Sequence, residues 1–254
     1  MKDLTWPALE PAIQLAVYEK NITGIKYVIF RLNSTREIIV SFRGTVNVKN
    51  WILNLILTDK PKYTKPGPLF HYGFKVAYES ILSSLLDQLK LILELNPKFN
   101  LVFTGHSLGG AIATIAVADL LLKDTVKCQK SLYALSIPSF RVSLITFGTP
   151  RVGNENTSQL FRQLKLRSSY RVTNRNDPVP RLPPRSIGFQ HVQREYWINL
   201  SGELVTCSDA LSSEANDCIN FLDLPNASTS AHTVNYMGLD IGTKACSLPV
   251  DQAK

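Results

Sequence analysis

The segment that most constrains the fold is Leu101–Gly110, which reads Leu-Val-Phe-Thr-Gly-His-Ser-Leu-Gly-Gly. A short apolar run comes before a Gly-x-Ser-x-Gly pattern, and an alanine-rich run that is apolar almost all round follows it over Gly109–Leu122. The pattern predicts a strand over Asn100–Thr104, a sharp turn at Ser107 and a buried helix. Such a turn strains the serine backbone and lifts its Oγ above the sheet, and glycines flank it because a Cβ there would clash with neighbouring backbone. The alternative, a glycine-rich turn with an incidental serine, does not explain why the strand and the helix are both present.

The rest of the chain alternates strand-like and helix-like patterns. Residues 27–32 and 37–42 predict a hairpin around a polar turn. Further strands are predicted at 142–147, 170–173 and 191–199, and helices at Phe74–Leu95 and Glu155–Leu166. This alternation predicts an α/β fold with a mostly parallel central sheet and helices on both faces. No internal repeat or low-complexity linker interrupts it, so we expect a single domain over residues 1–254.

Composition excludes several classes of protein. Hydrophobic residues make up 44% and charged residues 19%, as in globular proteins. No apolar run reaches the roughly 18 residues that a membrane span needs, so we expect no transmembrane segment. The formal charge is +8, but the basic residues are scattered. We therefore expect no nucleic acid partner and at most a mild attraction to anionic interfaces. The cysteine spacing fits no metal site, and we expect neither a metal nor an organic cofactor.

Cysteines and sequons favour a secreted protein. Cys207 and Cys218 flank a short polar segment that could close as a disulfide loop. Five Asn-x-Ser/Thr sequons point the same way. They begin at Asn21, Asn33, Asn156, Asn199 and Asn226. Residues 1–4 do not resemble a signal peptide, so we expect the leader to lie outside this chain.

A serine hydroxyl becomes a good nucleophile only beside a base, and that base needs an acid to orient it. In this architecture the acid and then the histidine follow the serine along the chain. Two histidines follow Ser107, namely His191 and His232. His232 lies in a loop leading to a last element, whereas His191 opens a predicted strand and is better interpreted as structural, with a satisfied hydrogen bond. Placement favours His232. His106 is adjacent to the serine but is expected to project elsewhere on the turn.

Asp177 is the favoured acid. It follows a predicted strand, and the carboxyl end of that strand should lie at the same edge of the sheet as Ser107. Three competitors, Asp209, Asp217 and Asp223, lie in a polar stretch where aspartates are usually surface charges. A fourth, Asp119, lies on the buried-type helix and is expected to be structural.

Seven motifs, in this order, resemble those of the fungal class 3 lipases of the Rhizomucor, Rhizopus and Thermomyces type. The resemblance extends from about residue 38 to 246. The motifs are Ser41–Thr45, Asn50–Ile52, Gly73–Phe74, Gly105–Gly110, Pro150–Asn154, Asn176–Pro184 and Glu195–Ile198. The resemblance implies an α/β-hydrolase-type fold and a triad of Ser107, Asp177 and His232.

The resemblance also implies an oxyanion hole, a lid and a disulfide. The oxyanion donors would be the N–H and hydroxyl of Thr45 and the N–H of Leu108. The lid would be a short amphipathic helix at residues 46–57, which covers the site in water and opens at a lipid surface. A core helix is the alternative interpretation. The apolar lid and substrate-binding positions are Val48, Trp51, Ile52 and Leu55. Cys207 and Cys218 match a disulfide pair of the family.

The chain departs from the family pattern in three places. The family's N-terminal helix and pro-segment are expected to be missing. Cys246 resembles a cysteine whose usual partner lies in that missing region, so we expect it to be unpaired. The insertion Asp124–Phe140, which contains Cys128, is longer and more irregular than in the family.

These features together predict a carboxylic ester hydrolase, a secreted monomeric triacylglycerol lipase that acts on acylglycerols at lipid–water interfaces. Related folds leave open a feruloyl esterase, a phospholipase A1 or a mono- and diacylglycerol lipase. The apolar lid residues favour a lipid interface over a soluble aryl ester. A non-catalytic lipid-binding protein is the third hypothesis, and the complete set of triad and oxyanion residues argues against it.

Overall fold

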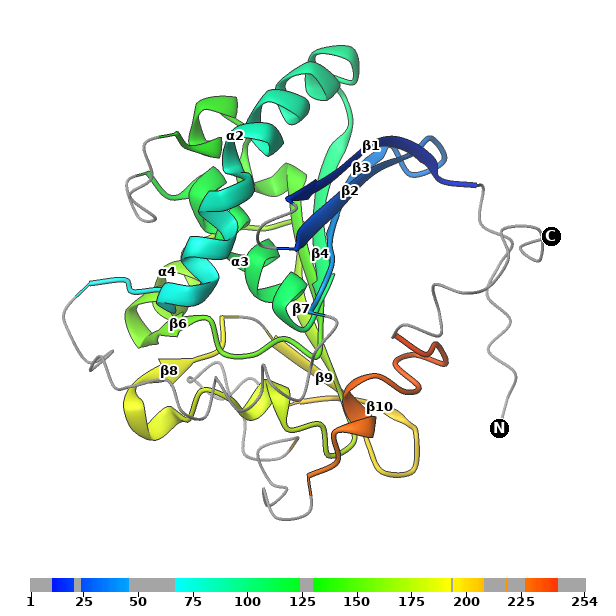
Figure 1. Cartoon of the computed structure of the whole chain (residues 1–254), viewed down its shortest axis with the longest axis vertical. Helices are drawn as coiled ribbons and strands as arrows, with labels where there is room; N and C mark the ends of the chain where they lie inside the picture. The colour runs from blue at the N-terminus through cyan, green and yellow to red at the C-terminus, as the bar shows by residue number, and fades with distance from the viewer. Residues whose placement is uncertain are drawn as a thin grey trace.

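The structure is a computed structural model that describes residues 11–20, 24–45, 67–123, 130–192, 194–207, 218 and 227–241. An eight-stranded sheet in the order β1-β2-β3-β4-β5-β7-β9-β10 runs through its centre (Figure 1). Its strands are β1 Ile13–Lys20, β2 Ile25–Leu32, β3 Glu37–Phe42, β4 Asn100–His106, β5 Val142–Phe147, β7 Ser168–Asn174, β9 Arg194–Ile198 and β10 Leu204–Thr206.

The sheet is mostly parallel, as predicted. The neighbours from β3 through β4, β5 and β7 to β9 all run in the same direction. The strands β1, β2 and β10 pair antiparallel at the two edges. The predicted hairpin is the β2–β3 pair, in which Tyr27 faces Phe42 and Leu32 faces Glu37. Parallel strands need crossover connections, and those connections bring in the helices.

One face of the sheet carries the main core. The register pairs Val40 with Phe103, and Phe103 in turn with Leu144. All three side chains are fully buried. The helix α3 (Leu108–Leu121) packs on this face, and α2 (Tyr72–Leu95) packs on α3. Because α3 is enclosed by the sheet on one side and by α2 on the other, it carries small and apolar residues all round, as its sequence predicts.

The described helices α2, α3 and α4 (Glu155–Gln163) lie on one side of the sheet (Figure 1). On the other side, Tyr236, Met237 and Ile241 pack against Val172 and Ile198. Residues 236–241 therefore contribute to the cover of that second face.

Small elements connect the larger ones. A two-stranded sheet pairs β6 (Gly153–Asn154) with β8 (Phe189–Gln190). Five short 3-10 helices are described at Leu132–Leu135, Ser139–Arg141, Val179–Arg181, Arg185–Ile187 and Ser230–His232.

Several predicted boundaries need correction. The strand predicted to open at His191 begins at Arg194, because His191 lies in a buried loop where its Nε2 bonds the Pro180 carbonyl oxygen at 2.7 Å. That bond confirms His191 as a structural histidine with a satisfied hydrogen bond. The helix predicted to reach Leu166 ends at Gln163. The strands β1 and β10 were not predicted.

The predicted disulfide joins Cys207 to Cys218. Within the described ranges, no helix combines the length and the hydrophobicity needed to cross a membrane. Residues 46–57, predicted as the lid, lie outside these ranges, as do Cys128 and Cys246.

Candidate active site

Ser107 occupies a tight turn between β4 and α3. Its backbone angles are φ 58° and ψ −126°, a region that non-glycine residues rarely adopt and that marks stored strain. The flanking glycines make the turn possible. A Cβ at Gly105 would lie 2.3 Å from the carbonyl carbon of Gly109, and one at Gly109 would lie 2.0 Å from the carbonyl oxygen of Phe42. The predicted strand–serine–helix turn is therefore confirmed.

The two residues predicted to form the oxyanion hole belong to segments that adjoin Ser107. A Cβ at Gly44 would lie 3.4 Å from the Cβ of Ser107, so the chain leaving β3 passes beside the nucleophile just before Thr45. Leu108 is the first residue of α3. The first N–H groups of a helix have no acceptor within the helix, and they point toward negative charge.

His232 and Asp177 form a buried hydrogen-bonded pair. The Nδ1 atom of His232 lies 2.8 Å from Oδ2 of Asp177, and both side chains are 0% exposed. The carboxylate also accepts a 2.9 Å hydrogen bond from the backbone N–H of Val179. A carboxylate only accepts, so Nδ1 of His232 carries the hydrogen and its Nε2 is left with a lone pair.

The atoms that would exchange a proton are both buried and unpaired. Among the described residues, neither Oγ of Ser107 nor Nε2 of His232 has a hydrogen-bond partner. The hydrogen bond between His232 and Asp177 is formed, but none joins Ser107 to His232. Catalytic hydrogen bonds are often long before substrate binds.

Two residues of the site were missed by the sequence reasoning. His106 was expected to project elsewhere, but its ring centroid lies 4.4 Å from that of His232, and its Nε2 lies 2.7 Å from the His232 carbonyl oxygen. The hydroxyl of Tyr236 donates to Oδ2 of Asp177. Tyr236 lies just after His232 in the sequence, and this proximity was the only available signal for it.

Burial governs the protonation of both added residues. Burial, together with the nearby His232, lowers the pKa of His106 to about 3. Burial and the neighbouring carboxylate of Asp177 raise the pKa of the Tyr236 phenol well above its usual 10.0. Both side chains are therefore neutral at moderate pH.

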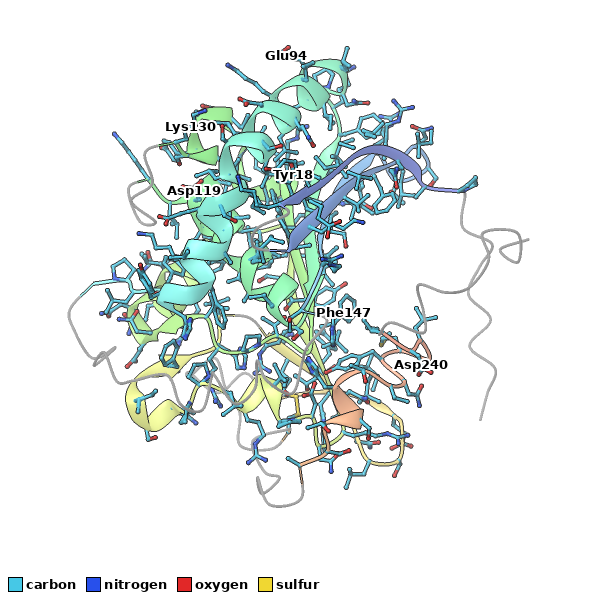
Figure 2. The ribbon with its side chains drawn as sticks, in the orientation of Figure 1. Tyr18, Glu94, Asp119, Lys130, Phe147 and Asp240 are labelled. Atoms are coloured by element: carbon cyan, nitrogen blue, oxygen red, sulfur yellow. A yellow bond between two sulfur atoms is a disulfide. The ribbon has the colours of Figure 1, made fainter. Side chains whose placement is uncertain are left out.

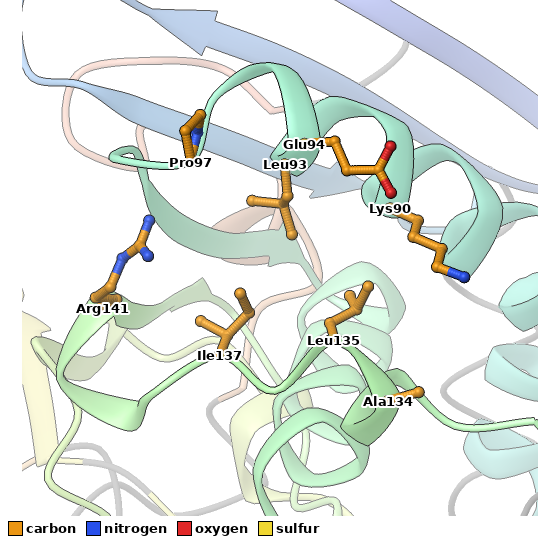
Figure 3. Close-up of a pocket in the computed structure, with 8 residues that line it drawn as sticks. All are labelled: Lys90, Leu93, Glu94, Pro97, Ala134, Leu135, Ile137 and Arg141. Atoms are coloured by element: carbon orange, nitrogen blue, oxygen red, sulfur yellow. The ribbon is translucent and has the colours of Figure 1, made fainter.

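A pocket of about 320 Å³ lies elsewhere, between the end of α2 and the segment that leads into β5 (Figure 3). Leu93, Leu135 and Ile137 point into it, and Pro97 and Arg141 lie at its edge. These residues come just before β4 and β5, at the amino ends of the parallel strands. Ser107 follows the carboxyl end of β4, so this pocket is not the candidate active site.

The described residues offer one group of metal-ligand type. Glu195, Cys207 and Cys218 bring their ligand atoms within 4.8 Å of one another. The two sulfurs are joined in a disulfide, and metal binding requires thiolates. This group does not fit a metal ion.

The remaining predicted positions fall beyond the ranges given above. Val48, Trp51, Ile52 and Leu55 lie outside the described residues. The competing acids Asp209, Asp217 and Asp223 do so too.

Comparisons with known proteins agree with this geometry. The family described as lipase (class 3) matches residues 39–187. A secreted mono- and diacylglycerol lipase 1 of Fusarium solani is 39% identical over 177 residues, which are 70% of this chain and 48% of that protein. A lipase of Rhizomucor miehei is 30% identical over 245 residues, covering 94% of this chain and 59% of the relative. The chain thus spans about half the length of the curated relatives it matches.

Solved structures show the same fold. Lipase II from Rhizopus niveus superimposes with a TM-score of 0.77 at 26% identity, covering 92% of this chain and 83% of the other. The triacylglyceride lipase of Rhizomucor miehei gives a TM-score of 0.76 at 28% identity, covering 93% and 83%. The fold is that of the α/β hydrolases, and the chain belongs to the class 3 lipase family.

Proposed function

We propose that this chain hydrolyses the carboxylic ester bonds of acylglycerols through Ser107, His232 and Asp177. The observation that carries the proposal is the buried hydrogen bond from His232 to Asp177. The His232 ring contacts the ring of His106, which directly precedes the serine in the strained strand-to-helix turn. A serine, a histidine and an acid in this arrangement perform nucleophilic acyl transfer.

The proposed reaction has two halves. Oγ of Ser107 attacks the ester carbonyl while Nε2 of His232 takes its proton, and Asp177 stabilises the resulting imidazolium. The N–H and hydroxyl of Thr45 and the N–H of Leu108 hold the oxyanion. The imidazolium then protonates the departing alcohol, which leaves an acyl-enzyme. Water then attacks the acyl-enzyme while Nε2 of His232 takes its proton. That proton returns to Oγ of Ser107 as the bond to the acyl group breaks, and the fatty acid leaves.

Burial of the nucleophile supports gating by a lid. Ser107 is only 1% exposed, so an ester can reach its Oγ only after part of the chain moves. We assign this movement to residues 46–57 and its apolar contacts with lipid to Val48, Trp51, Ile52 and Leu55. The enzyme would then work as a monomer at lipid–water interfaces. Secretion fits the disulfide and the name of the Fusarium solani relative.

Replacement of the nucleophile tests the proposal. We expect Ser107→Ala to lower turnover of an emulsified acylglycerol by about 10⁴-fold or more, as in other serine hydrolases with a triad. A fluorophosphonate probe should label the wild-type chain and not the variant. Turnover near the wild-type level in a folded Ser107→Ala protein would exclude this function.

A preference for partial glycerides is the second candidate. The 39% identity to a mono- and diacylglycerol lipase favours it over a triacylglycerol preference. Turnover of triolein, diolein and monoolein emulsions at matched interfacial area separates the two. A clear preference for triolein would contradict the second candidate and leave the ester chemistry intact.

A further inference from the structure

Three polar side chains of the active site meet at one glycine. Gly148 directly follows β5 and has a φ of +54°. A Cβ there would lie 2.7 Å from the Tyr236 hydroxyl, 3.0 Å from Nε2 of His106 and 3.1 Å from Oδ2 of Asp177. Any side chain at this position would therefore push against Asp177 and against the two residues that contact the catalytic pair.

Tyr236 fixes the acid. Its hydroxyl donates to Oδ2 of Asp177, the same oxygen that accepts from His232. The ring of Tyr236 is 1% exposed and packs with Val172 and Ile198. A rotamer locked by packing can hold its partner in place more tightly than a surface side chain can.

His106 fixes the main chain of the base. His232 ends a 3-10 turn of three residues, outside the sheet, so no strand pairing holds it. Nε2 of His106, the last residue of β4, lies 2.7 Å from the carbonyl oxygen of His232. The side-chain amide of Asn174, at the end of β7, donates to the Ala231 and Val234 carbonyl oxygens at 2.9 Å. Side chains of the sheet thus hold the loop that carries the histidine.

We propose that Tyr236 and His106 are positioning residues, which hold Asp177 and the backbone of His232 in the reactive arrangement around Gly148. The proposal rests on the proposed function, since it assigns residues that serve the same triad.

The protonation of both residues suits this role. A carbonyl oxygen only accepts, so Nε2 of His106 must carry a hydrogen. With its pKa lowered to about 3 by burial, His106 remains a neutral donor and does not compete with His232 for the serine proton. Burial raises the pKa of Tyr236, and the charges of Asp177 and Glu195 add to the effect, so its hydroxyl keeps its hydrogen.

The first test removes one oxygen atom. Tyr236→Phe keeps the ring packing and deletes the hydroxyl. We expect kcat on a soluble p-nitrophenyl ester to fall about tenfold with KM unchanged. The acid limb of the kcat profile should move to higher pH, because a carboxylate that has lost a donor stabilises the imidazolium more strongly. Unchanged kcat with an unchanged acid limb would overturn the role of Tyr236.

The second test uses a conservative rescue. His106→Leu removes the donor and should lower kcat about tenfold, whereas His106→Gln keeps an N–H of similar reach and should retain most of the activity. Equal kcat in the two variants, whether high or low, would overturn the role of His106.

The third test has a matched glycine control. Gly202 also has a positive φ, +86°, but a Cβ there would meet no atom within 4 Å. Gly148→Ala should slow fluorophosphonate labelling of Ser107 about 100-fold, and Gly202→Ala should not, although both strain the backbone. Equal labelling rates would contradict the proposal.

The Ser107→Ala variant distinguishes a failure of the proposed function from a failure of the positioning role alone. If this variant keeps its ester turnover, the proposed function fails. If it is inactive while Tyr236→Phe, His106→Leu and Gly148→Ala all match the wild-type chain, the positioning role alone fails.

Discussion

At the scale of single residues, His71 is a buried histidine that the proposed mechanism does not use. Its ring centroid lies 4.2 Å from that of Phe74 and 5.8 Å from that of Phe189. Neither ring nitrogen has a hydrogen-bond partner within the part of the chain that the structure describes. Burial lowers the pKa of His71 from 6.5 to about 4. The folded chain therefore binds this proton less readily than the unfolded chain does.

That difference makes stability depend on pH. The unfolded state takes up the proton first as the pH falls, so the stability tied to a neutral His71 is complete above pH 6.5 and is lost toward pH 4. His71→Phe keeps an aromatic ring without the titration. Between pH 7 and 4.5, we expect the unfolding free energy of the wild-type chain to fall on the order of 2–3 kcal/mol more than that of the variant.

Urea unfolding at the two pH values measures this difference. His106 also has a lowered pKa, but it is present in both proteins and cancels in the comparison. Parallel losses of stability in the two proteins would show that His71 does not contribute.

At the scale of elements, Asp119 joins three segments. Its carboxylate accepts from the Tyr78 hydroxyl at 2.6 Å, from Oγ of Ser131 at 2.8 Å and from the Leu132 backbone N–H at 2.7 Å. These donors come from α2 and from the start of the 3-10 helix at residues 132–135. Figure 2 labels Asp119 beside α2, far from the labelled Phe147 at the end of β5. Asp119 is therefore structural, as its place on a buried helix predicted.

Removal of this carboxylate should destabilise the helical layer without changing the chemistry. Asp119→Ala leaves the Tyr78 hydroxyl and the Leu132 N–H without their acceptor in the core, at a cost of about 3 kcal/mol. Asp87 is an exposed acid on α2, so Asp87→Ala is the matched control and should change stability by less than about 0.5 kcal/mol. Denaturant unfolding measures both, and kcat per folded molecule should be unchanged. Equal stability in the two variants would contradict the role of Asp119.

The elements that the sequence predicted best are those with a strong local period. The strand at 142–147 has its predicted bounds, and α2 begins two residues earlier than predicted. The strand β1 was missed because its residues are exposed or half-buried, so its pairing with β2 decides its structure more than its own pattern does. Edge strands carry little periodic signal of this kind.

The active site likewise contains residues that the sequence predicted and residues that it did not. The elbow around Ser107 and the choice of Asp177 and His232 followed from motif and placement. The roles of His106 and Tyr236 depend on contacts between residues 126 and 59 positions apart in the chain, which no local pattern reveals. The lack of space at Gly148 likewise exists only after folding.

At the scale of the whole molecule, the topology brings the proposed active-site groups together at the carboxyl ends of the parallel strands. Thr45 follows β3, Ser107 follows β4 and Asp177 follows β7, and these strands are parallel. Their carboxyl ends therefore meet, as they do where ligands bind in other open α/β sheets. The pocket of Figure 3 lies at the opposite ends of β4 and β5.

The net charge of the whole chain is expected to affect its adsorption to a lipid surface. The formal charge of +8 should draw the chain to an anionic lipid surface, and salt should weaken this attraction. The Debye length falls from about 10 Å at 0.1 M salt to about 3 Å at 1 M. We expect turnover on an emulsion that contains anionic lipid to fall about threefold to tenfold over this range, because less enzyme reaches the surface.

Two controls separate adsorption from chemistry. Turnover of a dissolved short-chain ester, which needs no surface, should change little with salt, and so should turnover on a zwitterionic emulsion. An equal fall in all three assays would mean that salt acts on the folded enzyme. A fall confined to the anionic surface would show that the charge of the whole chain governs access to substrate, while the groups around Ser107 govern the rate of ester hydrolysis.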